Sequence, residues 1–471
     1  MSEYLFYGGI KIIENTLTIK SCPLCDSNKI TYSFVINGNL ICECKDCSHL
    51  FINQQPLNGS FFNENDFSLI EFEKIIKAKI ELNNTQKYNI LEIGSSILGD
   101  DNLNITNIKY TEINLFLQNI KENKKYDFCI LNNILDHSYD PCLFLRKIHG
   151  CLKKNSLLLF YIPVLDSKNA KKLKLKWSIF NGKRLHFFNK ATIQNILCKC
   201  GYEQIRLIPA DDNGVFISCK TGVLRDEKLI SIIIPVYNEG KTVETLLNNV
   251  VNKQLDGIKK EIIIVESNSK DSTRQIVENF VKWHPEVKLI LEEKPQGKGH
   301  AVRNGFKEAT GDFIAIQDGD LEYDINDYDQ LVEPLVHYQK PFVLGSRHTG
   351  DWKMRDFRDD KFKSTYMNLG HIFFTGLINI GCKVKLKDPF TMYKLFRREC
   401  LYDLEFDGNR FEIDWEIVIK LIRKGYIPEE IPINYNSRGY KEGKKVSLMI
   451  DPFRWIISFI RYRWFYKIGE K

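Results

Sequence analysis

Two aspartates separated by one glycine follow an apolar stretch in the second half of the chain. Residues 313–316 have the pattern of a buried strand, and Asp318-Gly319-Asp320 follows after one glutamine. Carboxylate oxygens are hard ligands that suit Mg²⁺ or Mn²⁺, so Asp318 and Asp320 are candidate ligands of a divalent cation. An ordinary acidic turn has the same pattern, because one short motif is weakly specific. The neighbouring segments favour the cation.

Two strand-and-loop segments and one basic loop precede this motif. Residues 230–236 form an apolar run that leads into Tyr237-Asn238-Glu239-Gly240, and residues 261–265 form another that leads into Glu266-Ser267. A glycine-containing basic loop, 294–299, then leads into a predicted helix. Strands that alternate with helices predict an open, largely parallel sheet, and ligands bind such sheets beyond the carboxyl ends of the strands.

These motifs resemble the family 2 glycosyltransferases of the GT-A fold, and most of all the branch of dolichyl- and polyprenyl-phosphate sugar synthases. The resemblance covers about 228–450 and includes Ile234-Pro235-Val236-Tyr237-Asn238-Glu239, Gln296-Gly297-Lys298-Gly299, Asp318-Gly319-Asp320, Gly345-Ser346-Arg347, Asp388-Pro389-Phe390-Thr391-Met392-Tyr393-Lys394 and Phe411-Glu412-Ile413-Asp414-Trp415-Glu416. Glu266-Ser267 stands where the family usually has two aspartates, so the resemblance does not identify the nucleotide base.

The resemblance implies a sugar transfer from a nucleoside diphosphate, with Mg²⁺ or Mn²⁺ on Asp318 and Asp320 acting as a Lewis acid on the diphosphate. It places contacts to the nucleotide sugar at Pro235, Tyr237, Glu239, Glu266, Lys298, Asp318, Arg347 and Lys444. Asp414 is the candidate catalytic base, and helix capping is the alternative role for it. Asp388 is a second candidate, for acceptor positioning or metal contact.

The last 34 residues, from Arg438, carry nine basic and three acidic residues interleaved with aromatic ones. No apolar run in this segment is long enough to span a membrane. Aromatic rings mixed with Arg and Lys suit the surface of an anionic membrane. A helix packed on the catalytic domain or on another subunit is the alternative. The net charge of the whole chain is only +7, which is too small to indicate a nucleic-acid partner.

Four of the thirteen cysteines form two Cys-x-x-Cys pairs near the N-terminus. Cys22 and Cys25 are separated from Cys44 and Cys47 by 18 residues, a spacing typical of a zinc ribbon. Cys42 is the alternative to Cys44 as a ligand. Four thiolate ligands leave no position for a substrate, so we expect the Zn²⁺ to be structural. The other cysteines are scattered, as in proteins of a reducing compartment.

Residues 20–220 resemble a zinc-ribbon class I S-adenosylmethionine methyltransferase. The resemblance rests on the strand-to-turn segment 88–96, the segment 126–137 and the strand 156–163. It implies a possible S-adenosylmethionine site at Glu92, Gly94 and Glu112. The glycine-rich loop of that family is reduced here to Gly94 and Gly99, and the interval from Gly94 to Asp127 leaves little room for a further strand. A scaffold that no longer methylates is the alternative.

We therefore predict an α/β protein with four parts. These are a zinc ribbon (1–56), a truncated methyltransferase-like α/β domain (57–222), a GT-A domain with a Rossmann-like mixed sheet (228–448) and a basic aromatic C-terminal helix (449–471). The expected function is metal-dependent sugar transfer to a polyprenyl phosphate or glycan acceptor, at the cytoplasmic face of a membrane. A bifunctional enzyme that also methylates a glycan intermediate and a non-catalytic adaptor are the alternatives.

Overall fold

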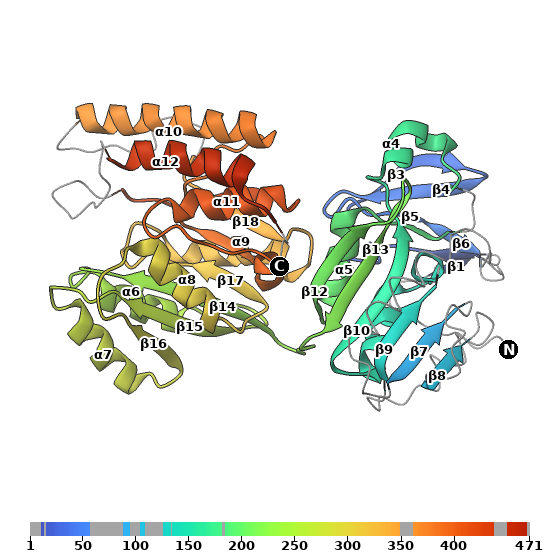
Figure 1. Cartoon of the computed structure of the whole chain (residues 1–471), viewed down its shortest axis with the longest axis horizontal. Helices are drawn as coiled ribbons and strands as arrows, with labels where there is room; N and C mark the ends of the chain where they lie inside the picture. The colour runs from blue at the N-terminus through green and yellow to red at the C-terminus, as the bar shows by residue number, and fades with distance from the viewer. Residues whose placement is uncertain are drawn as a thin grey trace. The chain divides into compact units, whose positions relative to one another are not determined.

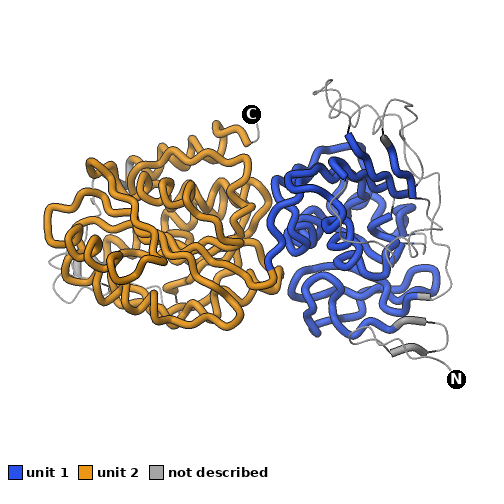
Figure 2. The backbone as a smooth tube through the Cα atoms, turned by 90° about the horizontal axis from the view of Figure 1, so that it is seen from below, with its two compact units in different colours: residues 1–225 blue, residues 226–471 orange. Residues whose placement is uncertain are grey.

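The computed structural model of the chain describes residues 11–13, 16–56, 88–94, 104–108, 126–132, 134–180, 184–348, 361–437 and 450–468. The chain divides into two compact units, Met1–Arg225 and Asp226–Lys471 (Figure 2). We refer to them as unit 1 and unit 2.

Unit 2 is built on a seven-stranded mixed sheet with the order β16-β15-β14-β17-β19-β18-β20. The strands are β14 (Lys228–Val236), β15 (Ile258–Glu266), β16 (Val287–Leu291), β17 (Phe313–Ile316), β18 (Phe342–Ser346), β19 (Lys394–Arg397) and β20 (Glu429–Pro432). Strands β14 to β17 are parallel, whereas β19 runs antiparallel to both β17 and β18. The sequence predicted the parallel part of this sheet.

Helices cover both faces of this sheet (Figure 1). They are α6 (Val243–Asn252), α7 (Thr273–Trp283), α8 (Lys298–Glu308), η4 (Ile325–Asp327), α9 (Tyr328–Val336), α10 (Lys361–Cys382), η5 (Arg398–Leu401), α11 (Ile413–Arg423), α12 (Ile450–Ile460) and the π-helical turn η7 (Arg461–Phe465). No helix among the described residues is both long enough and apolar enough to cross a membrane.

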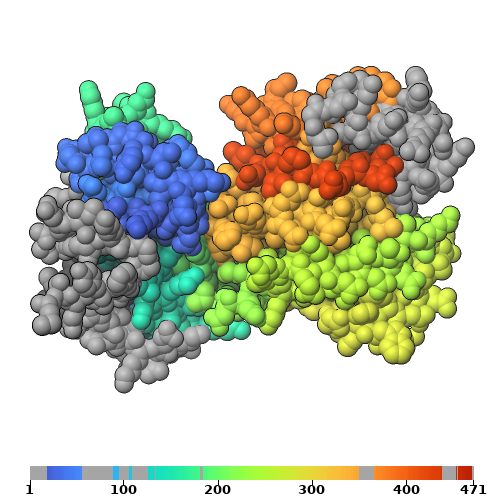
Figure 3. All heavy atoms as spheres, turned by 180° about the vertical axis from the view of Figure 1, so that it is seen from behind, coloured from blue at the N-terminus to red at the C-terminus, as the bar shows by residue number. Residues whose placement is uncertain are grey.

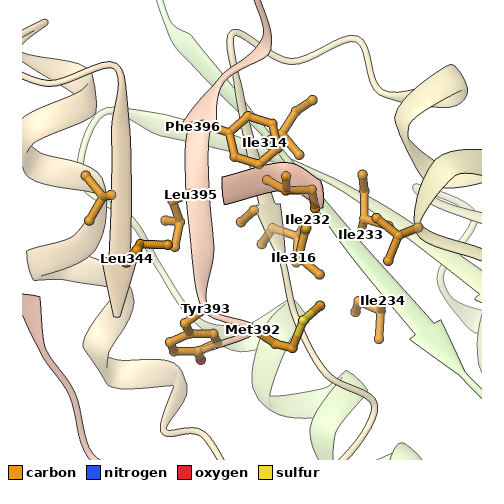
Figure 4. Packing of buried hydrophobic residues seen from close by; sticks show 14 of the residues in the cluster. Ile232, Ile233, Ile234, Ile314, Ile316, Leu344, Met392, Tyr393, Leu395 and Phe396 are labelled. Carbon is orange, nitrogen blue, oxygen red and sulfur yellow. The ribbon is translucent and has the colours of Figure 1, made fainter. Parts of the chain in front are cut away.

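The core of unit 2 lies between the central strands and these helices. β-Branched residues such as Ile232, Ile234 and Ile314 line neighbouring strands and suit a sheet that is buried on both faces. Leu395 and Phe396 of β19 extend the same core (Figure 4). This packing holds the carboxyl ends of β14 and β17 at one edge of the sheet, where the predicted ligand residues follow.

Unit 1 contains a six-stranded sheet with the order β12-β13-β10-β9-β7-β8. Its strands are β7 (Asn89–Ile93), β8 (Asn104–Ile108), β9 (Tyr126–Leu131), β10 (Leu152–Pro163), β12 (Tyr202–Pro209) and β13 (Gly214–Thr221). Strand β13 runs antiparallel to both of its neighbours, while β8, β7, β9 and β10 are parallel. Its helices are η2 (Leu135–His137), α3 (Pro141–Cys151), α4 (Lys168–Leu173), η3 (Lys174–Lys176) and α5 (Lys190–Lys199).

The interval between Gly94 and Asp127 holds a strand after all. Residues Asn104–Ile108 form β8, which pairs in parallel with β7. The expectation of too little room for this strand was therefore wrong, because five residues are enough to complete the edge of the sheet.

The N-terminal part of unit 1 forms two small antiparallel sheets. One has the order β1-β2-β6 and the other the order β11-β5-β4-β3. Their strands are β1 (Lys11–Ile13), β2 (Thr16–Thr18), β3 (Ile30–Ile36), β4 (Asn39–Cys44), β5 (Leu50–Ile52), β6 (Gln54–Pro56) and β11 (His186–Phe187). Strand β11 comes from the later part of unit 1, so the ribbon and the larger α/β region share one hydrogen-bonded sheet.

Candidate active site

A cleft of about 1030 Å³ lies at the carboxyl ends of β14 and β17 in unit 2. It is lined by most of the predicted site residues, namely Pro235, Tyr237, Glu239, Lys298, Asp318, Asp320, Arg347 and Asp414. These residues lie up to 179 positions apart in the sequence (Pro235 to Asp414), and the fold brings them to one edge of the sheet. Lys444 lies outside the described residues.

The loop that carries Asp318 and Asp320 is packed against the end of β14. A Cβ atom at Gly319 would come within 2.9 Å of Val236 Cγ1 and 3.2 Å of the carbonyl oxygen of Pro235. Glycine therefore lets the two carboxylates lie directly against β14. The backbone N–H of Glu322 donates a 3.0 Å hydrogen bond to Asp320 Oδ1, which orients that carboxylate.

Lys298, the first residue of α8, forms an ion pair with Asp318. Burial acts to lower the pKa of Lys298, but Asp318 and Asp414 outweigh it and raise that pKa. The flanking glycines make this position possible, because Cβ atoms at Gly297 and Gly299 would come within 2.3 Å of carbonyl oxygens in the loop 408–409. The ammonium group of Lys298 therefore lies close enough to Asp318 and Asp414 to offset part of their negative charge.

Asp414 is the second residue of α11 and faces the cleft. Its Oδ1 atom is buried and has no hydrogen-bond partner within the part of the chain that the structure describes. Burial raises the pKa of Asp414, although Lys394 and Lys298 oppose that shift. The helix begins after Glu412 without a side-chain capping bond, so the capping role considered for Asp414 is not what the structure shows.

Arg347 and Asp388 form a buried ion pair beside the cleft. Arg347 lines the cleft, whereas Asp388 has no exposed surface and accepts hydrogen bonds of 2.8 Å from both Nε and Nη2 of Arg347. Burial alone would raise the pKa of Asp388, but the guanidinium outweighs it and holds the pKa well below its usual range. These contacts favour a positioning role for Asp388 over direct catalysis.

Lys394 is a charged residue that sequence reasoning did not select. It opens β19, is fully buried, and its ammonium group donates to the carbonyl of Thr391. Burial lowers its pKa to about 8, and the nearby carboxylates of Asp414 and Asp388 act in the opposite direction. A lysine inside the apolar run 392–396 was the available signal, because a buried lysine requires a local reason.

Only some of the residues predicted to contact the nucleotide sugar line the cleft. Pro235, Tyr237 and Glu239 line the cleft as expected. Glu266 does not, because its carboxylate is buried and accepts hydrogen bonds from the backbone N–H groups of Asn268 and Ser269, at 3.1 and 2.7 Å. The next residue, Ser267, lines the cleft instead.

One side of the same cleft is apolar. Leu369, Phe373 and Phe374 of α10 contribute to it, together with Trp455 and Ile456 of α12. The two helices lie side by side (Figures 1 and 3), and Phe374 and Trp455 form an edge-to-face pair with ring centroids 5.4 Å apart. The cleft therefore joins a charged end at the sheet to an apolar end between two helices.

The four predicted zinc ligands come together in unit 1. The sulfur atoms of Cys22, Cys25, Cys44 and Cys47 all lie within 4.8 Å of one another, and all four residues are buried. Tetrahedral Zn²⁺ with bonds of about 2.3 Å places its sulfur ligands about 3.8 Å apart. The Cys22–Cys47 and Cys25–Cys44 distances of 3.6 and 3.5 Å are close to that value. Cys42 is outside the cluster.

Two of the residues predicted for a possible S-adenosylmethionine site, Glu92 and Gly94, lie at the carboxyl end of β7. Glu92 is buried and accepts a 2.9 Å hydrogen bond from Asn107 Nδ2. Gly94 has a φ of 112°, a conformation that favours glycine, and its N–H donates to Ile108. Glu112 and Gly99 lie outside the described residues.

Comparison with known proteins agrees with this organisation. Residues 231–404 match the family Glycosyl transferase family 2, and residues 72–207 match a family described as Methyltransferase domain. Unit 2 therefore contains a family 2 glycosyltransferase domain, and unit 1 contains a methyltransferase-like domain. Both matches confirm the two families that the sequence predicted, and the seven-stranded sheet of unit 2 confirms the predicted mixed α/β architecture.

Two relatives illustrate the similarity. The chain is 30% identical over 215 residues to a dolichol-phosphate mannosyltransferase of Pyrococcus furiosus. The aligned region covers 46% of this chain and 58% of that protein. It is 27% identical over 293 residues to a dolichyl-phosphate beta-glucosyltransferase of Saccharomyces cerevisiae, covering 57% and 85%. The chain thus spans little more than half the length of the first relative.

Among solved structures, a glucosyl-3-phosphoglycerate synthase of Mycobacterium tuberculosis in complex with Mg²⁺ and uridine diphosphate aligns with a TM-score of 0.39. The sequence identity is 16%, and the alignment covers 50% of this chain and 79% of that one.

Proposed function

We propose that the protein transfers a sugar from a nucleoside-diphosphate sugar to a polyprenyl phosphate or glycan acceptor, with the help of Mg²⁺ or Mn²⁺. The observation that carries this proposal is the composition of one cleft in unit 2. Asp318, Asp320 and Asp414 line its polar end, and α10 and α12 line its apolar end. A nucleoside diphosphate with a bound divalent cation fits the acidic end, and a polyprenyl chain fits the apolar end.

Asp318 and Asp320 would hold the divalent cation. Two carboxylates on one short loop supply the hard oxygen ligands that Mg²⁺ and Mn²⁺ require, and Lys298 already provides a positive charge beside Asp318. When bound, the cation would neutralise the charge of the leaving diphosphate. Lys298 would then be available to the phosphate oxygens, because its present partner is a proposed ligand of the cation.

The other charged residues would act on the acceptor. Asp414 has a buried oxygen without a partner among the described residues, so it can accept a proton from an acceptor hydroxyl. A phosphate acceptor already carries negative charge and needs no base, and Asp414 would then orient the sugar or the acceptor. Arg347, held by Asp388, presents a fixed positive charge to the same cleft.

The C-terminal segment supports an acceptor that is carried in a membrane. One of its faces packs on unit 2 through Phe459 and Tyr462, as the alternative prediction had it. Its other face exposes Ile457 and Phe465, at 65% and 75%, and on α10 Ile380 is 82% exposed. Exposed apolar residues next to arginines suit a peripheral contact with an anionic membrane.

A panel of nucleotide sugars tests the proposed reaction. Purified protein with Mn²⁺ should be stabilised against thermal unfolding by at least one nucleotide sugar, and should transfer that sugar to a short-chain polyprenyl phosphate. Asp414→Asn should keep the stabilisation and lose transfer to a hydroxyl acceptor. If no nucleotide sugar stabilises the protein at millimolar concentration, the proposal is wrong.

The membrane contact has its own test. Ile457→Ser with Phe465→Ser alters exposed residues only, so the fold should be retained while sedimentation with anionic vesicles decreases. Thr310→Ser, at a polar exposed position of the same unit, serves as the control. Unchanged sedimentation of the double variant would remove this part of the proposal.

Methyl transfer by unit 1 is the second candidate function. The match of residues 72–207 and the position of Glu92 and Gly94 at the carboxyl end of β7 favour an S-adenosylmethionine site. Isothermal titration with S-adenosylmethionine would show it directly. No heat of binding at millimolar ligand would leave unit 1 as a scaffold.

A further inference from the structure

A short segment of unit 1 carries lysines and leucines in alternation at its surface. Residues 171–176 read Lys-Lys-Leu-Lys-Leu-Lys, span the end of α4 and all of η3, and are all exposed. Leu173 and Leu175 are 39% and 58% exposed. Helix α4 projects from the surface of unit 1 (Figures 1 and 3). Neither the sugar-transfer cleft nor the cysteine cluster uses this segment.

The segment is held in place at both ends. Ser167 caps α4, because its hydroxyl accepts a hydrogen bond from the N–H of Ala170. Trp177 follows the last lysine, is only 2% exposed, and donates a 2.9 Å hydrogen bond from its indole N–H to Asn213 Oδ1. Phe180 packs edge-on against Trp177. The two leucines are therefore displayed by an anchored turn, and their exposure follows from its geometry.

The positive charge of this turn is not neutralised within the described part of unit 1. Lys168, which precedes it, pairs with Asp212 at 2.9 Å. The side-chain ammonium groups of Lys171, Lys172, Lys174 and Lys176 form no ion pair or hydrogen bond with any described residue. Four ammonium groups without an acidic partner among the described residues lie within six positions, and such a cluster attracts a polyanion.

The leucines indicate which polyanion fits. A run of lysines alone is common on solvated surfaces and would suit nucleic acid equally well, and a single exposed leucine needs no explanation. Two leucines placed between four lysines add apolar contact to charge. A bilayer surface offers both, since the headgroups carry negative charge and the acyl boundary accepts apolar side chains.

We propose that the turn formed by residues 171–176, the lysine–leucine turn, docks unit 1 on an anionic lipid surface. The lysines approach the lipid phosphates, and Leu173 and Leu175 enter the boundary between headgroups and acyl chains. This contact is independent of the one proposed for α12, because its residues belong to a different unit.

Sedimentation of the full chain with vesicles tests this proposal. The vesicles contain phosphatidylcholine alone or phosphatidylcholine with phosphatidylserine. Leu173→Ser with Leu175→Ser should lower partitioning onto the anionic vesicles several-fold, and replacing the four lysines by serine should lower it by at least about tenfold. Both variants retain α12, so the change reports on unit 1.

The matched control replaces four other lysines of unit 1 by serine, namely Lys29, Lys45, Lys153 and Lys154. It removes the same formal charge from exposed positions, three of which are in ion pairs with Asp46, Glu43 and Asp127, and should change partitioning little. A leucine variant that partitions like the wild type would overturn the proposal, as would a control that loses as much as the lysine variant. If the lysine variant loses binding to single-stranded RNA while keeping its vesicle binding, the turn is a nucleic-acid surface and the proposal is wrong.

Discussion

Arg347 and Asp388 form a doubly hydrogen-bonded ion pair in the interior of unit 2, with both side-chain contacts at 2.8 Å. The backbone N–H of Arg347 donates a third hydrogen bond to the same carboxylate, at 2.9 Å. Three donors fix Asp388 completely, and the carboxylate in turn fixes the guanidinium at the wall of the cleft. The pair thus has two effects: it stabilises the fold of unit 2, and it holds a positive charge at the wall of the cleft.

Asp388→Asn should destabilise the protein by about 3–5 kcal/mol, because it leaves the buried charge of Arg347 without its partner. Urea unfolding at neutral pH measures this change. Asp329→Asn is the control, since the Asp329 side chain is 61% exposed where it pairs with Lys253 and its replacement should cost at most about 1 kcal/mol. Equal destabilisation by the two variants would contradict the prediction.

The same pair predicts a pH dependence of stability. The pKa of Asp388 is lower in the folded protein than in the unfolded chain, so its stabilisation is complete above the unfolded value of about 3.9 and is lost as the pH falls further. The stability difference between the wild type and Asp388→Asn should therefore narrow below about pH 4. A difference that stays constant from pH 7 to pH 3 would show that Asp388 is not paired as an anion.

Lys394→Met should shift the pH profile of sugar transfer to a hydroxyl acceptor. Lys394 opposes the upward shift of the Asp414 pKa, so its removal raises that pKa further. If Asp414 acts as the base, the acid limb of the profile should move to higher pH by about one unit. Lys420→Met is the control, because Lys420 is equally buried but pairs with Glu416. An acid limb that does not move would remove Lys394 from the site.

The local patterns of the sequence were sufficient to place Asp318, Asp320 and Lys298 at one site. Each follows or precedes a strongly patterned strand or helix, and parallel strands bring their carboxyl ends to one edge. Glu266 shows where this reasoning stops. Its position at the end of β15 was predicted, but a turn with Asn268 at a φ of 54° directs two N–H groups at its carboxylate and keeps it out of the cleft.

A lysine inside an apolar run marked Lys394 as unusual, but local pattern could not show that it lies near Asp414. Its burial depends on β19 lying between β17 and β18, and β19 is antiparallel to both. Such a pairing joins segments about 50 to 80 residues apart in the chain, and alternation of apolar residues does not encode it. The paired state of Asp388 depends on the same long-range arrangement, which is why the sequence could offer it only as a second candidate for catalysis.

Asp320→Asn should lower sugar transfer by at least about a hundredfold, because a proposed cation ligand loses its charge. Titration with Mn²⁺ should show weaker binding, while thermal unfolding without metal stays close to that of the wild type. Asp324→Asn is the control, since Asp324 lies on the same loop and caps η4. Wild-type turnover by Asp320→Asn would refute the assignment of the metal site.

Zinc removal should affect unit 1 alone. Elemental analysis of the purified protein should find about one zinc per chain, and a strong chelator should lower the unfolding temperature of unit 1, because structural zinc contributes directly to folding. Stabilisation of unit 2 by a nucleotide sugar should persist. Cys44→Ser should lose the metal, whereas Cys42→Ser should retain it, since Cys42 lies outside the cluster. If Cys42→Ser loses zinc and Cys44→Ser keeps it, the ligand set is wrong.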